Sequence, residues 1–203
     1  MSETDANAAG SERGRPRPAR RRILEAAARR FYADGVAATG IDTITADAGV
    51  AKMSLYNNFS SKSDLVRSYL DARHEEWLGL YRARLEHADG AREGVLAVFD
   101  AYADHAAFAY THGFRGCGLL NAAAELPAGD EGRSVVRAHK EEVELLIAGH
   151  LEQLLPDRSD EARTTAEHLA FLLEGAMARA GLEGDGERLS HARAMAAALL
   201  DRL

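Results

Sequence analysis

The residues best suited to chemistry lie in one short segment, residues 52–62, and the chemistry they suit is contact with nucleic acid. The segment reads Lys-Met-Ser-Leu-Tyr-Asn-Asn-Phe-Ser-Ser-Lys. Lysine, serine and tyrosine side chains can donate hydrogen bonds to phosphate oxygens, and asparagine can pair with the edge of adenine through two hydrogen bonds. With helical spacing, Leu55 and Phe59 point inward. The side chains left on the outside are those of Lys52, Met53, Ser54, Tyr56, Asn57 and Asn58.

Two short helices must hold this segment in place. Ile41, Ile44 and Ala48 form one apolar face that ends at Gly49, and the second helix follows directly after Val50. A glycine at this point supplies the positive φ that a tight turn between two helices needs. The pattern predicts a helix-turn-helix, in which the second helix is short enough to enter a major groove. The alternative is a helical hairpin that is packed for structural reasons alone.

The run from Ile44 to Leu65 closely resembles the DNA-binding domain of TetR-type transcriptional repressors, and the resemblance extends over residues 20–67. Those proteins carry Ala-Gly-Val-Ser-Lys followed by Leu-Tyr-x-x-Phe-x-x-Lys. This chain has Ala-Gly-Val-Ala-Lys and then Leu-Tyr-Asn-Asn-Phe-Ser-Ser-Lys. Residues 115–125 also resemble a Gly-Cys-x-x-x-Asn segment found in one branch of that family. The rest of the chain matches only in length and helix pattern.

The resemblance implies a role for each matching position. Thr39, Ser54, Tyr56 and Lys62 are expected to contact the phosphate backbone. Lys52, Met53, Asn57 and Asn58 are expected to read the bases. The chain departs from the family pattern where Gly40 and Ala51 replace the usual helix-capping serine or threonine, and loss of such a cap to alanine costs about 1 kcal/mol. Asn58 replaces a common aromatic residue or histidine, which puts the base preference in doubt.

The distribution of charge agrees with binding of a polyanion by one end of the chain. The net charge is −7, yet residues 13–62 hold ten basic and four acidic residues, a formal charge of +6. Residues 63–203 carry −10. A basic first quarter on an acidic body favours separate partners for the two ends, although a solvated tail would give the same balance. The run Arg20 to Arg22 has the same two interpretations, phosphate or minor-groove contact and simple solvation.

The whole chain is predicted to be all-α, with about nine helices. No segment sustains strand alternation, and 4 prolines leave few helix breakers. We predict a disordered arm at 1–16, a three-helix helix-turn-helix domain at 17–62, and a helical effector-binding and dimerisation domain at 63–203. Ser61 and Asp64 resemble a shortened capping box at the start of the body's first helix. Further helical patterns lie at 91–110, 118–125, 132–155, 160–181 and 188–202.

Composition excludes several other classes of protein. One cysteine permits neither an intrachain disulfide nor a four-thiolate zinc site. No apolar stretch approaches the roughly 20 residues needed to span a bilayer, and no signal peptide is evident, so we expect a cytoplasmic protein. The histidines show no tight metal-binding pair, and we expect neither a metal nor a cofactor. Cys117 suits a redox sensor, a nucleophile or a structural position, and no neighbouring base supports enzymatic use.

A recognition helix alone reads few base pairs, so we expect a homodimer on a near-palindromic operator. The last two helices supply the predicted seam, whose alanines permit close approach. The alternative is that these faces close the core of a single chain. The seam residues are Leu169, Leu173, Ala176 and Ala180 on the first helix and Leu189, Ala192, Ala196, Leu199 and Leu203 on the second.

The aromatic residues of the body are expected to line an effector pocket in part, because the resemblance implies one. For each of them, ordinary core packing is the alternative. Polar groups among them are the better indicators of specificity. The candidate ligand-binding residues are Trp77, Phe99, Tyr102, Asn121, His139 and Phe171, with His105 as a further polar candidate.

These observations together predict a ligand-responsive transcriptional regulator without enzymatic activity, most consistent with a repressor that a small-molecule effector releases from DNA. Two other classes are weighed against it. A hydrolase that uses Cys117 would lack a general base, a phosphate loop and a metal. A ligand-independent architectural DNA binder would need the basic region and a fully packed body. Activation in place of repression depends on where the operator lies.

Overall fold

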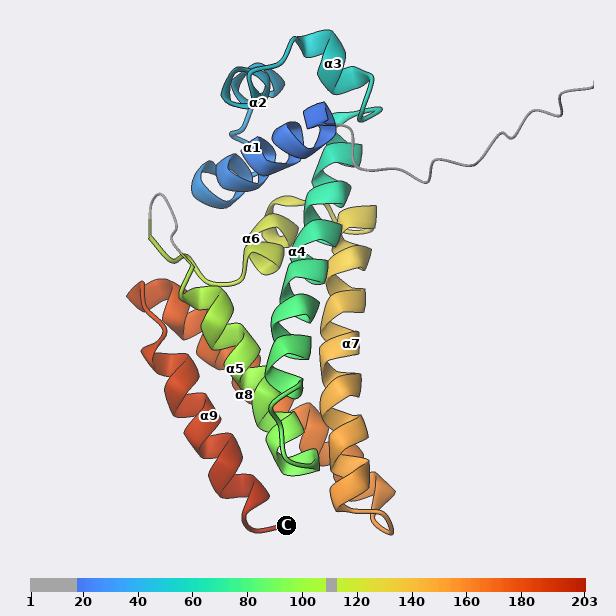
Figure 1. Cartoon of the computed structure of the whole chain (residues 1–203), viewed down its shortest axis with the longest axis vertical. Helices are drawn as coiled ribbons and strands as arrows, with labels where there is room; N and C mark the ends of the chain where they lie inside the picture. Colours follow the sequence, from blue (N-terminus) through green and yellow to red (C-terminus); the bar gives the residue numbers. More distant parts are fainter. Residues whose placement is uncertain (1–17, 109–112) are drawn as a thin grey trace, which may run out of the picture.

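The computed structural model describes residues 18–108 and 113–203, and nine α-helices form in these two stretches (Figure 1). The predicted disordered arm at 1–16 lies outside the described residues. The fold class is all-α, as predicted, and no strand occurs in the described part of the chain. The helices are α1 Pro18–Asp34, α2 Ile41–Ala48, α3 Lys52–Tyr56, α4 Lys62–Leu85, α5 Ala91–Ala106, α6 Gly118–Glu125, α7 Glu131–Leu154, α8 Ser159–Glu183 and α9 Glu187–Leu200.

Helices α1 to α3 form a small unit at one end of the molecule (Figure 1). Ile23, Ile44 and Leu55 are fully buried and supply one core residue from each of the three helices. The turn between α2 and α3 passes through Gly49 with φ of +60°, the left-handed conformation that the sequence predicted. Because burial of these side chains is the main stabilising term, the short α3 depends on its neighbours for its structure.

Helix α4 leaves this unit and enters the body, where it packs on α5 and α7 (Figure 1). Helix α8 packs on α7 and α9, and α9 also packs on α5. The core of the body includes Trp77, Phe99, Ile147 and Leu173, each at most 1% exposed. Helix α6 is short and lies beneath α1, beside α4. The first unit therefore contacts the body both through α4 and through α6.

The helix boundaries agree with the sequence patterns to within a few residues. The predicted capping box is present, because Ser61 Oγ accepts a hydrogen bond from the Asp64 amide at 3.0 Å. Gly40 and Ala51 make no side-chain cap, as their residue types imply. Helix α5 ends at Ala106, before the predicted boundary at 110, and the last residues of that prediction lie outside the described residues. In the described residues no helix is both long and apolar enough to cross a membrane.

The seam predicted on the last two helices needs correction at the level of residues. Most of the predicted seam is buried inside the chain's own core, with exposures of 0 to 2%. These helices instead expose Phe171, Leu182 and Met195. Helical spacing reveals that an apolar face exists, but it does not reveal which neighbour covers that face. The buried seam residues are Leu169, Leu173, Ala180, Leu189, Ala192 and Ala196.

Candidate nucleic-acid interface and the body behind it

Helix α3 presents the outward face that the sequence predicted. Leu55 is fully buried and Phe59 nearly so, and together they fix α3 against α1 and α2. On the opposite side Met53 is 70% exposed and Tyr56 is 46% exposed. Asn57 is exposed at the end of the helix. An apolar thioether and a phenol side by side on a free surface suit contact with a base edge and with a phosphate.

Two of the predicted contact residues of α3 are less exposed than the others. The Asn58 side-chain amide donates a hydrogen bond to the Ser54 carbonyl oxygen at 2.7 Å, and both residues are half-buried. This bond satisfies a carbonyl near the end of α3 that has no partner within the helix. The predicted base contact of Asn58 therefore depends on its remaining N–H and its carbonyl oxygen.

Lys52 forms an ion pair with Asp42 of α2, with 2.8 Å between Nζ and the carboxylate oxygen. The Asp42 hydrogen bond and charge raise the pKa of Lys52. Both side chains face solvent, so the pair contributes little to stability. The pair also offsets part of the positive charge that the sequence places here, and a phosphate or base would compete with Asp42 for the ammonium.

Thr39 is predicted to contact a phosphate, but its side chain is buried. Its side chain is 3% exposed, and its hydroxyl donates a hydrogen bond to the Gly35 carbonyl at 2.6 Å. This bond closes the turn that follows α1. Because a hydroxyl has one hydrogen, the bond to Gly35 leaves none to donate to a phosphate oxygen.

Lys62 begins α4 at the edge of the candidate interface. The cap formed by Ser61 and Asp64 fixes this helix start, and Asp64 also accepts a hydrogen bond from the Ser60 amide at 2.8 Å. Within the described stretches, Lys62 makes no ion pair. Its ammonium is therefore available to a phosphate at the N-terminus of α4, where the helix dipole also favours an anion.

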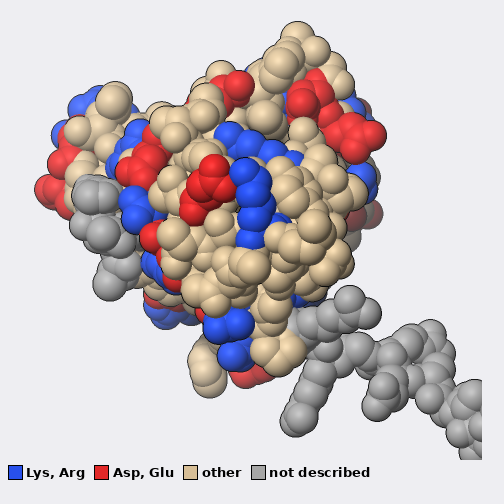
Figure 2. All heavy atoms as spheres, turned by 90° about the horizontal axis from the view of Figure 1, so that it is seen from above, with Lys and Arg blue, Asp and Glu red and all other residues tan. Residues whose placement is uncertain are grey.

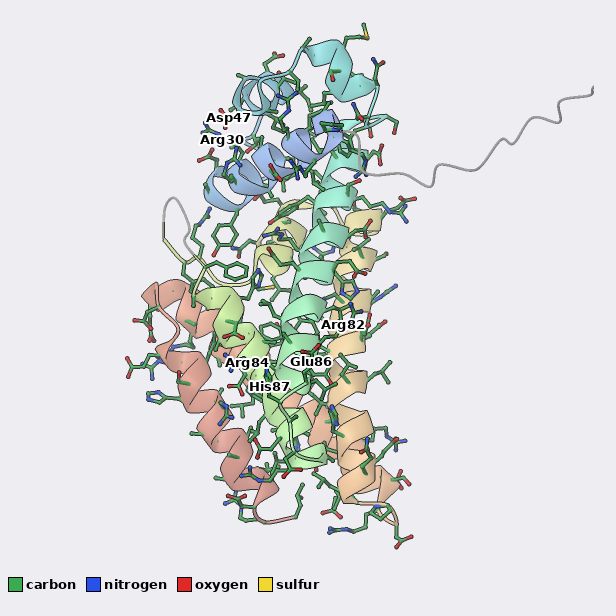
Figure 3. All side chains as sticks on the ribbon, in the orientation of Figure 1. Arg30, Asp47, Arg82, Arg84, Glu86 and His87 are labelled. Atoms are coloured by element: carbon green, nitrogen blue, oxygen red, sulfur yellow. The ribbon has the colours of Figure 1, made fainter. Side chains whose placement is uncertain are left out.

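Arginines on α1 join the three helices of this unit. Arg30 donates two hydrogen bonds to Asp47 of α2, at 2.6 and 3.2 Å (Figure 3). Arg20 lies with its guanidinium carbon 4.7 Å from the centre of the Phe59 ring and donates a hydrogen bond to Ser68 of α4. The view down on this end of the molecule shows lysine and arginine side chains among a largely uncharged surface, with acidic side chains nearby (Figure 2).

In the body, three of the predicted ligand-binding residues form one aromatic cluster. The ring centre of Trp77 lies 5.2 Å from that of Tyr102 and 5.3 Å from that of His139. The Tyr102 hydroxyl lies 3.3 Å from His139 Nε2, and His74 Nδ1 lies 2.9 Å from His139 Nδ1. These rings come from α4, α5 and α7 and pack directly on one another, as the core-packing alternative anticipated.

The other three predicted ligand-binding residues lie outside this cluster, each in a different environment. Phe99 is a core residue of α5. Asn121 donates a hydrogen bond to the Arg115 carbonyl at 2.9 Å and lines a surface cavity with Leu120 and Met177. Phe171 is 64% exposed on α8, so the core-packing alternative does not hold for its ring. Its residue type suggested burial, but its helical position faces solvent.

A partly buried lysine that the sequence did not place in the interior lies beside the aromatic cluster. Lys140 Nζ is 2.6 Å from a Glu174 carboxylate oxygen, 3.2 Å from the Tyr102 hydroxyl and 3.7 Å from the Cys117 sulfur. Burial lowers the pKa of Lys140, but Tyr102, Cys117 and Glu174 outweigh burial and raise it overall. In the sequence Lys140 stands in the run His-Lys-Glu-Glu, which is typical of a solvated helix face, so no local pattern indicates its burial.

The pKa of His139 leads to a prediction about pH. Burial, with added repulsion from Lys140 and neighbouring histidines, lowers its pKa from 6.5 to about 3. Below pH 6.5 the unfolded chain binds a proton there that the folded chain does not bind, so stability falls as the pH falls from 6.5 toward 3. At pH 5 the loss is about 2 kcal/mol, since one pKa unit corresponds to 1.36 kcal/mol.

The measurement is urea unfolding of the wild type and His139→Gln at pH 7 and at pH 5. We expect the variant to lose about 2 kcal/mol less than the wild type between the two values, because glutamine does not titrate. An equal loss in both proteins would contradict the role given to His139.

Three histidines of the body, His74, His139 and His150, make hydrogen bonds to other side chains. In residues 18–108 and 113–203 no group of three or more His, Cys, Asp or Glu side chains is arranged to hold a metal ion. His139 contacts His74 and Tyr102, and His150 accepts or donates a hydrogen bond with the Tyr81 hydroxyl at 2.7 Å. His112 lies outside the described residues.

Polar contacts connect the body to the end of α1. The Glu125 carboxylate, at the end of α6, accepts hydrogen bonds from the amides of Val36 and Ala37 at 3.1 and 2.7 Å. The Arg115 guanidinium donates to the carbonyls of Tyr32 and Ala33 at 2.8 and 2.6 Å. A displacement of residues 115–125 would therefore act on the last turn of α1 and on the turn that follows it.

Comparisons with known proteins test the sequence resemblance directly. A family model described as "Bacterial regulatory proteins, tetR family" matches residues 23–69, from α1 into α4. The chain is 34% identical to SCO4454, a TetR-family transcriptional regulator from Streptomyces coelicolor whose crystal structure is known. That match covers 91% of this chain and 95% of SCO4454, with a TM-score of 0.78. The chain belongs to the TetR family of transcriptional regulators.

Two curated relatives in the TetR-type regulator group match over shorter stretches. ArpR, a probable HTH-type transcriptional regulator from Pseudomonas putida, is 44% identical over 86 residues, which are 40% of this chain and 41% of ArpR. FasR, an HTH-type transcriptional activator from Mycolicibacterium smegmatis, is 35% identical over 100 residues, which are 48% of this chain and 46% of FasR. The chain thus spans less than half the length of these curated relatives.

Membership in the TetR family confirms the predicted fold and class. TetR-family proteins are transcriptional regulators and not enzymes, so the hydrolase alternative at Cys117 is not supported. Family members bind DNA and act as dimers with small-molecule effectors. The individual contacts of α3 and of the aromatic cluster in this TetR-family regulator remain predictions.

Proposed function

We propose that this TetR-family regulator binds a near-palindromic operator as a homodimer in the cytoplasm and represses transcription until a small-molecule effector releases it. The single observation that carries the proposal is the outward face of α3, where Met53 and Tyr56 are exposed while Leu55 is fully buried. A helix fixed on one side and free on the other suits insertion into a major groove. Residues 17–62 would form the DNA-binding domain and residues 63–203 the effector and dimer domain.

Repression by effector release requires a path from the body to the recognition helices. We infer that the path runs through α4, which starts at Lys62, and through the contacts of Arg115 and Glu125 with the end of α1. Movement of either element would change the separation of the two recognition helices in a dimer. Half-sites one helical turn apart would then lose one set of contacts.

The first experiment is a gel shift of the full chain on its own upstream intergenic DNA, with a scrambled duplex as competitor. Retention that the scrambled duplex does not displace supports an operator-binding regulator. If the dimeric protein binds the upstream DNA no more tightly than the scrambled duplex, the result contradicts the proposal for this DNA. A reporter gene behind the same DNA separates repression from the activation that the name of FasR denotes.

Two substitutions test the residue assignments on that operator. We expect Tyr56→Ala and Lys62→Ala each to weaken binding about tenfold, because each removes one phosphate contact of about 1 to 2 kcal/mol. Lys62→Ala should also lower the slope of log affinity against log salt by about 1, since one counterion fewer is released. Fluorescence anisotropy at several salt concentrations measures both quantities.

The matched control is Arg137→Ala, which removes a solvent-exposed cation from α7. It should bind the operator as the wild type does. Tyr56→Phe separates the hydroxyl from the ring. Wild-type affinity in both Tyr56→Ala and Lys62→Ala would contradict the assignments.

A further inference from the structure

A cavity of about 270 Å³ lies between the helix-turn-helix unit and the body, apart from the aromatic cluster around Trp77. Its walls come from α1, from α4, from the end of α5 and from the start of α6. Its volume is slightly below that of typical small-molecule sites, so it suits a ligand of one substituted ring. The lining residues that bear on its chemistry are Arg29, Tyr32, Tyr69, Arg73, His105 and Phe108.

One part of the lining is aromatic. Tyr69 is almost fully buried and is held by an edge contact with Phe31, with 5.5 Å between ring centres. Phe108 makes a similar edge contact with His105 at 5.3 Å. Helix α6 starts at Gly118, where a Cβ would lie 3.0 Å from the Tyr69 hydroxyl and 3.1 Å from the Tyr32 ring. A glycine at this position therefore leaves room for the two tyrosine rings around the cavity.

The charged part of the lining is cationic. Arg73 and Arg29 carry two positive charges, and Glu25 supplies the one carboxylate that lines the cavity. The Glu25 carboxylate lies 3.7 Å from the Arg21 guanidinium, whose positive charge offsets part of its negative charge. Arg73 forms an ion pair with Glu76, with 2.7 Å between a terminal nitrogen and a carboxylate oxygen, while its Nε is buried without a hydrogen-bond partner. A buried N–H without an acceptor is costly, and an anionic oxygen is the partner that best satisfies it.

We infer that this cavity binds a small aromatic carboxylate. The ring would lie among Tyr32, Tyr69 and Phe108, and the carboxylate would accept hydrogen bonds from Arg73 with added attraction from Arg29. Inorganic phosphate would leave the aromatic lining unused. A neutral ring would leave the Arg73 Nε unsatisfied, and an amine would be repelled by both guanidinium groups.

A ligand in this cavity would also affect DNA binding because of where the cavity lies. This inference rests on the function proposed above. Arg29 belongs to α1 and Arg73 to α4, so a bound carboxylate would hold the two helices together through charge. The angle between α1 and α4 sets the direction of α3 relative to the body. The ligand would therefore alter operator affinity from the junction of the two domains.

The binding test needs no DNA. Isothermal titration calorimetry of the full chain with benzoate, benzyl alcohol and benzylamine varies the charge on one ring. We expect one benzoate per chain, bound at least about tenfold more tightly than either isostere, because only the carboxylate pairs with a guanidinium. Equal affinity for benzoate and benzyl alcohol, or no heat with benzoate, would overturn the inference.

Three variants locate the site. Arg73→Gln should weaken benzoate about tenfold by removing the charged partner, and Ala28→Leu should weaken it by filling the cavity from the α1 side. Arg137→Gln on α7 is the matched control and should bind as the wild type does. Thermal melting of each variant establishes that it is folded. Wild-type affinity in both folded Arg73→Gln and folded Ala28→Leu would place benzoate elsewhere and overturn the inference.

A final gel shift with and without saturating benzoate tests the regulatory step separately. A change in operator affinity that Arg73→Gln abolishes supports a site that acts on DNA binding. Unchanged affinity with benzoate bound overturns the regulatory step, while calorimetry still supports the site. Failure of the free protein to bind its operator would contradict the proposed function and leave the calorimetric result intact.

Discussion

Gly181→Ala is expected to lower the stability of the protein by about 2 to 3 kcal/mol, the upper range for overpacking of a tight contact. Gly181 lies on α8 against the segment that leads into α6. A Cβ at this position would lie 2.7 Å from both the Cα and the amide nitrogen of Gly116, and 2.9 Å from the Arg115 carbonyl carbon. These are backbone atoms, so no side-chain rotation can relieve the contact.

The same substitution should also affect the helix-turn-helix unit. The Arg115 amide donates a hydrogen bond to the Tyr32 hydroxyl at 2.6 Å, and that hydroxyl donates to the Gly116 carbonyl at 3.2 Å. An alanine on α8 would push this segment away from α8, toward or across the end of α1. We therefore expect weaker operator binding in addition to the loss of stability.

Thermal melting provides the measurement, with Gly79→Ala as the matched control. Gly79 is an exposed helical glycine, and a Cβ added there would have no neighbouring atom within 4 Å, so alanine should stabilise the protein by about 0.5 to 1 kcal/mol. Opposite shifts of the melting temperature are expected, with Gly181→Ala lower by about 5 °C or more. A Gly181→Ala protein that melts with the wild type would contradict the close backbone contact.

Sequence alone predicted the features whose causes are local. The left-handed turn at Gly49, the cap formed by Ser61 with Asp64, and the inward direction of Leu55 and Phe59 each depend on residues within one or two helical turns. Residue type and spacing are sufficient for these features, because steric limits and side-chain hydrogen bonds act over that range.

Features that depend on distant segments were predicted poorly. Lys140 is partly buried because Glu174 and Tyr102 reach it from two other helices. The cavity beside Arg73 combines residues from four helices, so it exists only once those helices have packed.

The exposed ring of Phe171 lies on the surface where we expect the dimer to form. Its ring was expected to line an effector pocket or to pack in the core, yet it is 64% exposed, and Met195 on α9 is 60% exposed. The two residues line a groove of about 780 Å³ between α8 and α9, together with Leu172 and Ala176. In the homodimer proposed above, the partner of this groove is a second copy of the same groove. In a dimer with two-fold symmetry, the Phe171 ring of each copy would be buried against the partner, so the interface would contain this contact twice.

Phe171→Glu is therefore expected to separate the dimer into monomers. Burial of a phenylalanine side chain contributes about 1.5 to 3 kcal/mol, and the symmetric interface contains it twice, so the dimer dissociation constant should rise about a thousandfold. Sedimentation velocity measures this change. Operator affinity should fall by about two orders of magnitude, because a monomer engages one half-site without the second binding event that the dimer supplies.

The control is Leu145→Glu, which introduces the same charge at a leucine that is 70% exposed on α7, outside the groove. It should remain a dimer and keep its operator affinity. Because both variants add one carboxylate to an exposed apolar position, a difference between them reports the surface and not the charge. A dimeric Phe171→Glu protein would instead mean that α8 and α9 meet the partner through residues other than those of the groove.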